Sequence, residues 1–512
     1  DLVTVSGSGG SIVLQTIDGH ISLNDGTYNN NGKAISAGGS GNVLLQPGGE
    51  ETSITANADI ESDSGNISLI ADQDVTFNSG ADLFSGGSGS IDIQAVDGAI
   101  QLSRNSDQDA GRGAMRFKAF SDVSLGGTAS TSGNISVISE SRGILDGDNN
   151  VGVDLEAAGL RLDAATVIGG LGQSVDPIET SVDTVSARAG SGGINLLESD
   201  GLSVGNVGVT ISRVGSDAGL ADVTDATQSD LRTNSGSDGS IVLRSTGGDI
   251  NLTDGNSANN NLALQADGSG NILVEAIGGS GSIWAGAGLS SARGQITVLA
   301  GEDIGSTGQA PISSGGASSI DLQASSGSID LSTASSQDAD SGDIRMFAGQ
   351  NITLGGTAST TGNISIRADR GWIRDADSNG ALDISADNLR LEAAIGIGEQ
   401  GNAHNALETK VSTVSAIAGR AGINLLESDG LSVGDTPEIS VNRVGSKAQV
   451  AEIITETSMS DLVTASGSSG SIVLRATDGD ISLNDGTKKD DGRALFADNG
   501  KGNILVQAEG EG

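Results

Sequence analysis

The chain has 512 residues, of which 80 are Gly and 4 are Pro, with no Cys and 2% aromatic residues. The absence of Cys excludes disulfide bonds and zinc-thiolate sites, and the shortage of aromatic rings argues against a thick core, since these rings normally supply much of its buried area. The net charge of -40 argues against nucleic acid as a partner, because affinity for phosphate backbones comes largely from Lys and Arg.

Acidic residues are spread along the whole chain, and such charge favours solubility, mutual repulsion and cation binding. No run of 18 or more apolar residues occurs, so the sequence predicts no membrane-spanning helix. There is no initiating Met or signal peptide at Asp1, and the chain opens and closes within a repeated pattern. We therefore expect a segment of something longer.

Large repeats are visible from the first residue. Passages that begin at Asp1, Asp230 and Asp461 share one pattern, and their starts are 229 and 231 residues apart. The thirteen letters GINLLESDGLSVG occupy 193–205 and return at 422–434. The sequence thus divides into solenoid repeat units at 1–229 and 230–460, and the truncated start of a third at 461–512.

A finer pattern runs through each unit, built on the phrase Gly-(Ser/Asn/Asp)-Ile-x-(Leu/Val/Ile). Some occurrences are 24 residues apart, as at Val43, Ile67 and Ile91, and others are 9 apart, as at Ile12 and Ile21. Alternation over three to five residues between Gly, Asn, Asp and Ser clusters predicts short strands joined by turns. The segment 153–165 also reads as strand, in two pieces split at Gly159.

Short strands at this spacing predict an all-β fold, a parallel β-solenoid built from tandem units of about 230 residues. The 9-residue gaps would be two faces of one coil, and the 24-residue gaps would be full turns. With about 22 residues and about 4.8 Å of rise per coil, the chain would form a rod roughly 110 Å long. A string of sandwiches is the competing all-β architecture, and the scarcity of Trp, Tyr and Pro disfavours it.

Glycine and asparagine are expected at the corners of the coils. Glycine permits positive-φ corners. Asparagine would either bond along the stack or act as a turn former, and both interpretations stay open at Asn42, Asn66, Asn134, Asn271, Asn363 and Asn503.

Several passages give the chain a family resemblance, and they return in the second unit between Thr360 and Gly434: TSGNISV from Thr131, RGILDGD from Arg142, LRLDA from Leu160, IETSVDTVSA from Ile178 and the thirteen letters from Gly193. They resemble repeat regions of large bacterial surface proteins of the filamentous haemagglutinin type. The resemblance implies a right-handed parallel β-helix, export to the cell surface and a role as a fibre, stalk or adhesin.

Catalysis finds little support. Solenoid enzymes that cleave polysaccharides need clustered carboxylates or a base beside a cation, and such clusters cannot be located without the register of the coils. His20 corresponds to Asp249 and Asp480 in the other units, and His404 corresponds to Val175. Neither His is repeated and no nucleophile arrangement accompanies them, so we expect no catalytic residues and no enzyme activity.

Calcium is the one cofactor that the residues suggest. Asp375, Asp377 and Asn379 alternate before Gly380, with Asp383 beyond, as in a calcium loop. The second copy retains oxygen ligands at Asp146, Asp148 and Asn150, followed by Val151 where the loop needs Gly. No Glu stands at the twelfth position in either copy, so the EF-hand reading fails. A looser calcium site and an ordinary acidic turn both remain.

The sequence thus predicts a structural repeat segment of a long secreted or cell-surface bacterial fibre or adhesin. Open solenoid ends would favour filament formation, so the expected partners are neighbouring repeat units, other copies of the chain and surface polysaccharide. Two alternatives remain: a calcium-dependent matrix or adhesion module, and a β-helix enzyme that degrades polysaccharides.

Overall fold

A computed structural model describes residues 1–26, 31–148, 151–173, 175–256, 260–377, 380–401, 405–465, 469–487, 491–497 and 501–509. Strands dominate, and no α-helix occurs in these ranges. Contacts divide the chain into two compact units: Asp1–Thr246 with Gly255–Asn259, and Gly247–Asp254 with Asn260–Gly512. We describe each unit by itself.

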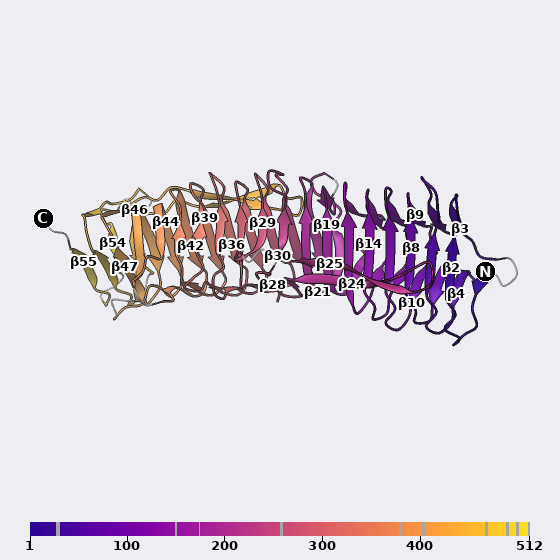
Figure 1. Cartoon of the computed structure of the whole chain (residues 1–512). Helices are drawn as coiled ribbons and strands as arrows, with labels where there is room; N and C mark the ends of the chain where they lie inside the picture. Colours follow the sequence, from indigo (N-terminus) through magenta and orange to yellow (C-terminus); the bar gives the residue numbers. More distant parts are fainter. Residues whose placement is uncertain are drawn as a thin grey trace. The chain divides into compact units, whose positions relative to one another are not determined.

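The strands of the first unit stack in three parallel ladders, one for each face of the coil (Figure 1). The first ladder contains β1 (Leu2–Val3), β4 (Lys33–Ala37), β7 (Asp59–Ser62), β10 (Leu83–Ser85), β13 (Gln108–Asp109) and β16 (Ala129–Ser130). The second contains β2 (Ile12–Gln15), β5 (Val43–Gln46), β8 (Ile67–Ala71), β11 (Ile91–Ala95), β14 (Met115–Ala119) and β17 (Asn134–Ser139). The third contains β3 (Ile21–Leu23), β6 (Ile54–Ala56), β9 (Val75–Phe77), β12 (Ile100–Leu102), β15 (Val123–Leu125), β18 (Ile144–Asp146) and β20 (Val167–Ile168).

The second unit has the same three ladders. One ladder contains β29 (Leu262–Ala266), β32 (Gly288–Ser291), β35 (Ile312–Ser314), β38 (Gln337–Asp338) and β41 (Ala358–Ser359). Another contains β30 (Ile272–Ala276), β33 (Ile296–Ala300), β36 (Ile320–Ala324), β39 (Ile344–Ala348) and β42 (Asn363–Ala368). The remaining one contains β28 (Ile250–Leu252), β31 (Ile283–Ala285), β34 (Ile304–Ser306), β37 (Ile329–Asp330), β40 (Ile352–Leu354), β43 (Trp372–Asp375) and β45 (Gly396–Ile397).

The register confirms the predicted solenoid and its period. Val43 pairs with Ile67, and Ile67 pairs with Ile91, so the 24-residue gaps are full turns. Ile12 and Ile21 lie in the consecutive strands β2 and β3, which belong to different ladders, so the 9-residue gap joins two faces of one coil. All pairings within these ladders are parallel, which makes each unit a parallel β-solenoid.

Two long strands in each unit span two faces. They are β19 (Leu155–Ala164) and β21 (Ile178–Ala189) in the first unit, and β44 (Ile384–Ala393) and β46 (Leu407–Ala418) in the second. In β19, Leu155 continues the first ladder by pairing with Ala129, and Gly159 continues the second by pairing with Asn134. The prediction of strand at 153–165 is therefore confirmed, but the two predicted pieces form one strand, with Gly159 at the change of partner.

The core is a column of aliphatic side chains that point into the coil. In the second ladder successive strands place these residues in direct register: Ile12, Val43, Ile67, Ile91, Met115, Ile135, Leu160 and Val185. All eight are buried. Burial of each such side chain stabilises the fold by about 1.5–3 kcal/mol, which explains how a chain with few aromatic residues builds a core.

Glycine has a second role besides the turns. Gly65, Gly89 and Gly113 precede successive strands of the second ladder, and their φ values are not positive. A Cβ on each would overlap the carbonyl oxygen of the glycine one coil earlier, which is Gly41, Gly65 and Gly89 in turn. Close backbone approach, rather than a positive-φ corner, therefore explains the glycine that opens the repeated phrase.

Corner side chains bond along the stack. The Asn66 amide N–H donates to Asn42 Oδ1 at 2.9 Å, and the Ser90 N–H donates to Asn66 Oδ1 at 2.9 Å. In the second unit Asn388 Nδ2 donates to Asn363 Oδ1 at 2.8 Å. Of the two interpretations of these asparagines, bonding along the stack is the one seen at Asn42, Asn66 and Asn363.

Each unit also carries an antiparallel β-hairpin that the sequence did not predict. We call these the strap hairpins: β24 (Val207–Val214) with β25 (Leu220–Gln228), and β49 (Ile439–Val444) with β50 (Val450–Glu456). The first crosses the outer side of the second ladder (Figure 1). Its Val214 N–H donates to Ser68 Oγ and its Ser212 N–H to Ser90 Oγ, both at 2.9 Å.

A chain of buried charges fixes each strap hairpin. In the first unit Asp92 accepts from Arg213 of the hairpin and from Arg116 of β14 at 3.2 Å, and Arg116 also binds Asp225 of the hairpin at 3.1 Å. The second unit repeats this chain with Arg443, Asp321, Arg345 and Glu456. Asp92 and Asp321 are fully buried, so each depends on its two arginines.

The coils that surround the strap hairpins complete the fold. In the first unit these strands are β22 (Gly193–Glu198), β23 (Leu202–Val204), β26 (Leu231–Thr233) and β27 (Ile241–Ser245). In the second they are β47 (Gly422–Glu427), β48 (Leu431–Val433), β51 (Leu462–Thr464), β52 (Ile472–Ala476), β53 (Ile481–Leu483), β54 (Leu495–Phe496) and β55 (Ile504–Ala508). Leu231 pairs with Ala187, so a strand that repeats the sequence of β1 continues the ladder of β2. In the described ranges, no helix has the length and apolar character to cross a membrane.

Candidate functional site

Two clusters of carboxyl groups lie between the end of a third-ladder strand, β18 or β43, and the long strand that follows it in the chain, β19 or β44. Cluster 1 contains Asp146 at the end of β18, Asp148, Asp154 just before β19, and Glu179 in β21. Cluster 2 contains the matching residues of the second unit, each 229 positions later: Asp375, Asp377, Asp383 and Glu408.

Backbone pairing explains why residues 25 positions apart meet. The Asp154 N–H donates to the Glu179 carbonyl oxygen at 2.9 Å, and the Glu179 N–H donates to Asp154 Oδ2 at 3.1 Å. The same exchange joins Asp383 and Glu408, with both distances at 3.0 Å. Each pair therefore sits side by side on adjacent coils.

The structure brings together most of the residues predicted to bind calcium. Asp146, Asp148 and Asp154 each place one carboxylate oxygen within 4.8 Å of the others. In cluster 2 the three that meet this distance are Asp375, Asp383 and Glu408. Asp377 is beside them, because its N–H donates to Asp375 Oδ1 at 2.8 Å. Asn379 and Asn150 lie outside the described residues.

The sequence analysis missed Glu179 and Glu408. Both follow the aliphatic residue that begins β21 or β46, in the passages IETSV and LETKV, and both recur at the 229-residue spacing. That recurrence was the available signal. Loop spacing alone could not reveal them, since the ligand comes from the next coil rather than from the loop.

Burial raises the pKa of some of the carboxyl groups in each cluster. In cluster 2, loss of solvation raises the pKa of Asp383 and of Glu408 above the usual range, and the Asp375 charge raises both further. In cluster 1, burial followed by the Asp146 charge raises the pKa of Asp154 and of Glu179. These carboxyl groups have too few neighbours that favour the charged form.

Several buried oxygens of the clusters lack a hydrogen-bond donor among the described residues. They are both side-chain oxygens of Glu408, Oε2 of Glu179 and Oδ2 of Asp146. Glu408 is only 5% exposed and Glu179 only 6%. A buried carboxylate without a donor is costly, so something must compensate for these oxygens.

A second pair of buried glutamates makes the contrast clear. Glu198 accepts from Thr180 Oγ1 at 2.7 Å and from the Val182 N–H at 3.3 Å. Glu427 accepts from Thr409 Oγ1 at 2.7 Å and from the Val411 N–H at 3.2 Å. Both are fully buried but have donors, so nothing about them points to a ligand.

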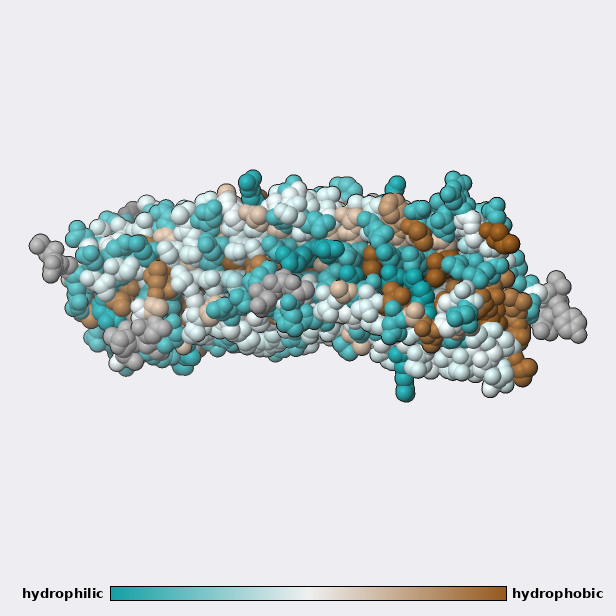
Figure 2. All heavy atoms as spheres, in the orientation of Figure 1, coloured by the Kyte–Doolittle hydropathy of each residue, from teal (hydrophilic) through white to brown (hydrophobic). Residues whose placement is uncertain are grey.

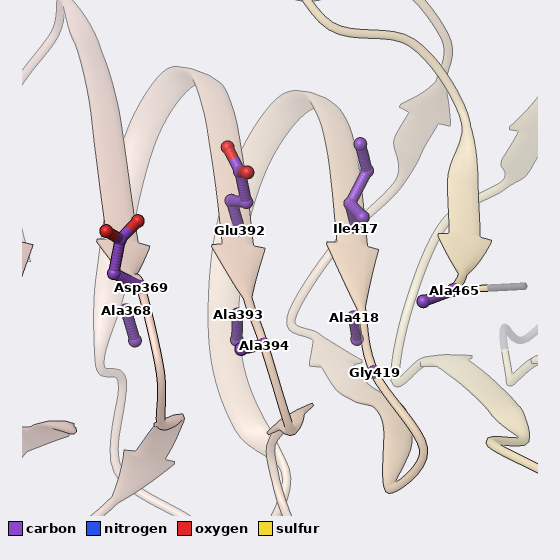
Figure 3. Close-up of a pocket in the computed structure, with 9 residues that line it drawn as sticks. All are labelled: Ala368, Asp369, Glu392, Ala393, Ala394, Ile417, Ala418, Gly419 and Ala465. Atoms are coloured by element: carbon purple, nitrogen blue, oxygen red, sulfur yellow. The ribbon is translucent and has the colours of Figure 1, made fainter. Parts of the chain in front are cut away.

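A further candidate is a surface hollow of about 160 Å³ at the ends of β42, β44 and β46 (Figure 3). Small residues such as Ala368, Ala393 and Gly419 line it, with the carboxylates of Asp369 and Glu392 at its upper side. These carboxylates already bind Arg367 and Arg390, both at 2.7 Å.

The matching hollow of the first unit differs in charge. It places Arg188 where the second unit has Ile417, and its Asp163 binds that Arg188 at 3.0 Å. The two acidic positions are kept as Glu140 and Asp163, but Arg188 adds a positive charge, so the two hollows do not present the same ligand chemistry. On the side that Figure 2 presents, polar and small residues predominate, and apolar residues gather toward the end that carries the N-terminus in Figure 1.

His20 has a structural role. Its Nδ1 accepts the N–H of Ser53 one coil later at 3.1 Å, and Asp249 Oδ1 accepts the N–H of Ser282 in the same way at 2.8 Å. A His and an Asp can therefore exchange at this corner, because both accept one backbone hydrogen bond. His404 lies outside the described residues.

No protein-family model, curated protein or solved structure matches this chain.

Proposed function

We propose that this chain is a structural repeat segment of a long bacterial protein that is secreted or displayed at the cell surface, where it serves as a fibre, stalk or adhesin shaft. The resemblance of its repeats to those of filamentous haemagglutinin-type proteins suggests the setting. The observation that carries the proposal is the duplication of structural contacts.

The two units share the charge chain under each strap hairpin, the buried glutamates and the carboxyl clusters. Several outer positions are not shared: His20 corresponds to Asp249, Trp372 to Gly143 and Ile417 to Arg188. The contacts that stabilise the coils are thus duplicated, whereas several outer residues vary. This pattern favours a structural role, since repetition extends a structural module and seldom benefits an active site.

The strap hairpins support the same proposal, because each hairpin bonds to several successive coils from which it is far apart in sequence. Val214 is bonded to Ser68 in one coil, Ser212 to Ser90 in the next and Gly208 to Asn134 further along. Such cross-links resist separation of neighbouring coils, which is the property that a shaft needs. The polysaccharide-degrading alternative is weakened by burial of the clustered carboxyl groups, because a polymeric substrate must reach its catalytic acids.

The location of the protein in its source cells tests the proposal directly. Antibodies raised against the chain are applied to intact source cells and to cells made permeable, and gold labels are counted by electron microscopy. The proposal predicts labelling of intact cells, along projections or in the surrounding matrix. Labelling only after permeabilisation would overturn it. Release of sugars from acidic or neutral polysaccharides by the purified chain would instead favour the enzyme alternative.

A further inference from the structure

We propose that clusters 1 and 2 are calcium sites, in which one divalent cation per unit joins the end of a third-ladder strand to carboxylates on two adjacent coils. This inference is independent of where the protein is located, so it can hold or fail separately from the proposed function.

Cluster 2 presents the clearer geometry. Asp375 ends β43, Asp383 precedes β44, and Glu408 lies in β46 on the next coil. Their carboxylate oxygens converge within 4.8 Å. Such convergence of three carboxylates without a cation would set like charges against one another.

Glu408 is the observation that points to a ligand. The residue is only 5% exposed, and one of its carboxylate oxygens lies within 4.8 Å of those of Asp375 and Asp383. No described N–H or hydroxyl donates to either of its oxygens. The neighbouring glutamate Glu427 accepts hydrogen bonds from the Thr409 hydroxyl and the Val411 N–H. This fold can therefore supply protein donors to a buried carboxylate, and it does not do so at Glu408. In cluster 1 the converging oxygens belong to Asp146, Asp148 and Asp154, and Oδ2 of Asp146 and Oε2 of the adjoining Glu179 likewise have no described donor.

The ligand chemistry selects calcium. All the groups are oxygen donors, and neither cluster contains His or Cys, so zinc and copper are disfavoured. Magnesium demands near-ideal octahedral geometry and gives up its water reluctantly, whereas calcium accepts six to eight oxygens in irregular arrangements, including bidentate carboxylates. Carboxylates from three different segments fit the irregular coordination that calcium accepts.

A proton shared between Asp383 and Glu408 is the competing way to satisfy these oxygens. The two explanations differ in a measurable way, because a shared proton would be indifferent to calcium concentration. A bound cation would stabilise the folded chain more as free calcium rises.

The first experiment is calorimetric titration of the full chain with calcium chloride, in physiological salt with excess magnesium to suppress weak binding by the acidic surface. Two tight sites per chain are expected. Glu408→Gln and Glu179→Gln should each remove one site, and the double variant should remove both. Glu427→Gln, which alters a buried glutamate outside the clusters, is the matched control and should retain two sites.

Terbium luminescence distinguishes the clusters. Trp372 begins the strand that ends at Asp375, so its Cα lies about 10 Å along the strand from that of Asp375, and Gly143 stands at the matching position of the first unit. Excitation of tryptophan should therefore sensitise terbium at cluster 2. The signal should be lost in Glu408→Gln, retained in Glu179→Gln, and displaced by calcium.

Absence of tight calcium binding in the wild-type chain would overturn the proposal in favour of a shared proton. Two sites that persist in the folded double variant would also overturn it, because the cation would then bind elsewhere. If Glu408→Gln fails to fold, as judged by circular dichroism, Asp375→Asn on the partly exposed side of the cluster provides the same test.

Discussion

Individual buried carboxyl groups make the stability of this chain depend on pH. Burial raises the pKa of Glu427 to about 7, although the Thr409 hydroxyl lowers it. A group whose folded pKa is raised holds its proton longer in the folded chain than in the unfolded one. Its contribution to stability is therefore fully present below the unfolded pKa of about 4.5 and is lost as the pH rises through about 7.

Glu427→Gln tests this dependence. Gln can still accept from the Val411 N–H and can donate to the Thr409 hydroxyl, so its cost at pH 4.5 should be small. At pH 8 the variant should be more stable than the wild type by on the order of 2 kcal/mol, because it carries no buried charge. Urea unfolding at both pH values measures the difference. An equal effect of the substitution at pH 4.5 and pH 8 would contradict the argument.

The glycine before each strand of the second ladder gives a second prediction for single residues. Gly89→Ala places a Cβ against the carbonyl oxygen of Gly65, so neighbouring coils must separate locally. We expect a loss of about 1–3 kcal/mol in the free energy of unfolding, as for other overpacked sites. Gly279→Ala is the control, since its Cβ would meet open space and its φ is not positive. Equal stability of the two variants would refute the role assigned to Gly89.

At the scale of elements, the strap hairpins depend on one buried aspartate each. Asp321→Ala leaves Arg345 and Arg443 without their shared partner, and removal of one member of a buried ion pair costs about 3–5 kcal/mol. Hydrogen exchange should accelerate in β49 and β50 more than in the ladders. Asp330→Ala, which removes an exposed charge from β37, should change neither measurement appreciably.

Unchanged exchange in β49 and β50 of the Asp321→Ala variant would show that the charge chain does not hold the hairpin. Because the first unit has the same arrangement, Asp92→Ala should reproduce the effect in β24 and β25.

The elements also show what the sequence could predict. The strand at β19 and the full turn from Val43 to Ile67 follow from local alternation and spacing, which depend on neighbours in the chain. The strap hairpins could not be predicted in this way, because β24 alternates apolar and polar residues much as the strands of the coils do. Its hydrogen bonds to Ser68 and Ser90, which are far away in sequence, distinguish it from them. The same holds for Glu408, whose meeting with Asp383 depends on coil register.

At the scale of the whole chain, stability should be local, because each coil contacts mainly its neighbours. Ile91→Ala and Ile320→Ala remove equivalent buried side chains from the two units, each at a cost of about 2–5 kcal/mol. Both tryptophans, Trp284 and Trp372, belong to the second unit. Tryptophan fluorescence should therefore report a lower unfolding midpoint for Ile320→Ala, and a much smaller change for Ile91→Ala.

Circular dichroism, which reports strands of both units, should register both substitutions. Coincident shifts of the fluorescence midpoint in the two variants would mean that the chain unfolds as a single cooperative body, contrary to the expected behaviour of a repeat array.

We propose that the chain is a structural shaft of stacked coils. The most direct measurement is cryo-electron microscopy of the native protein isolated from its source, with calcium and with a chelator. We expect particles built of stacked layers about 4.8 Å apart, with a strap hairpin on one side of each repeat. Compact particles without this layering would contradict the proposal.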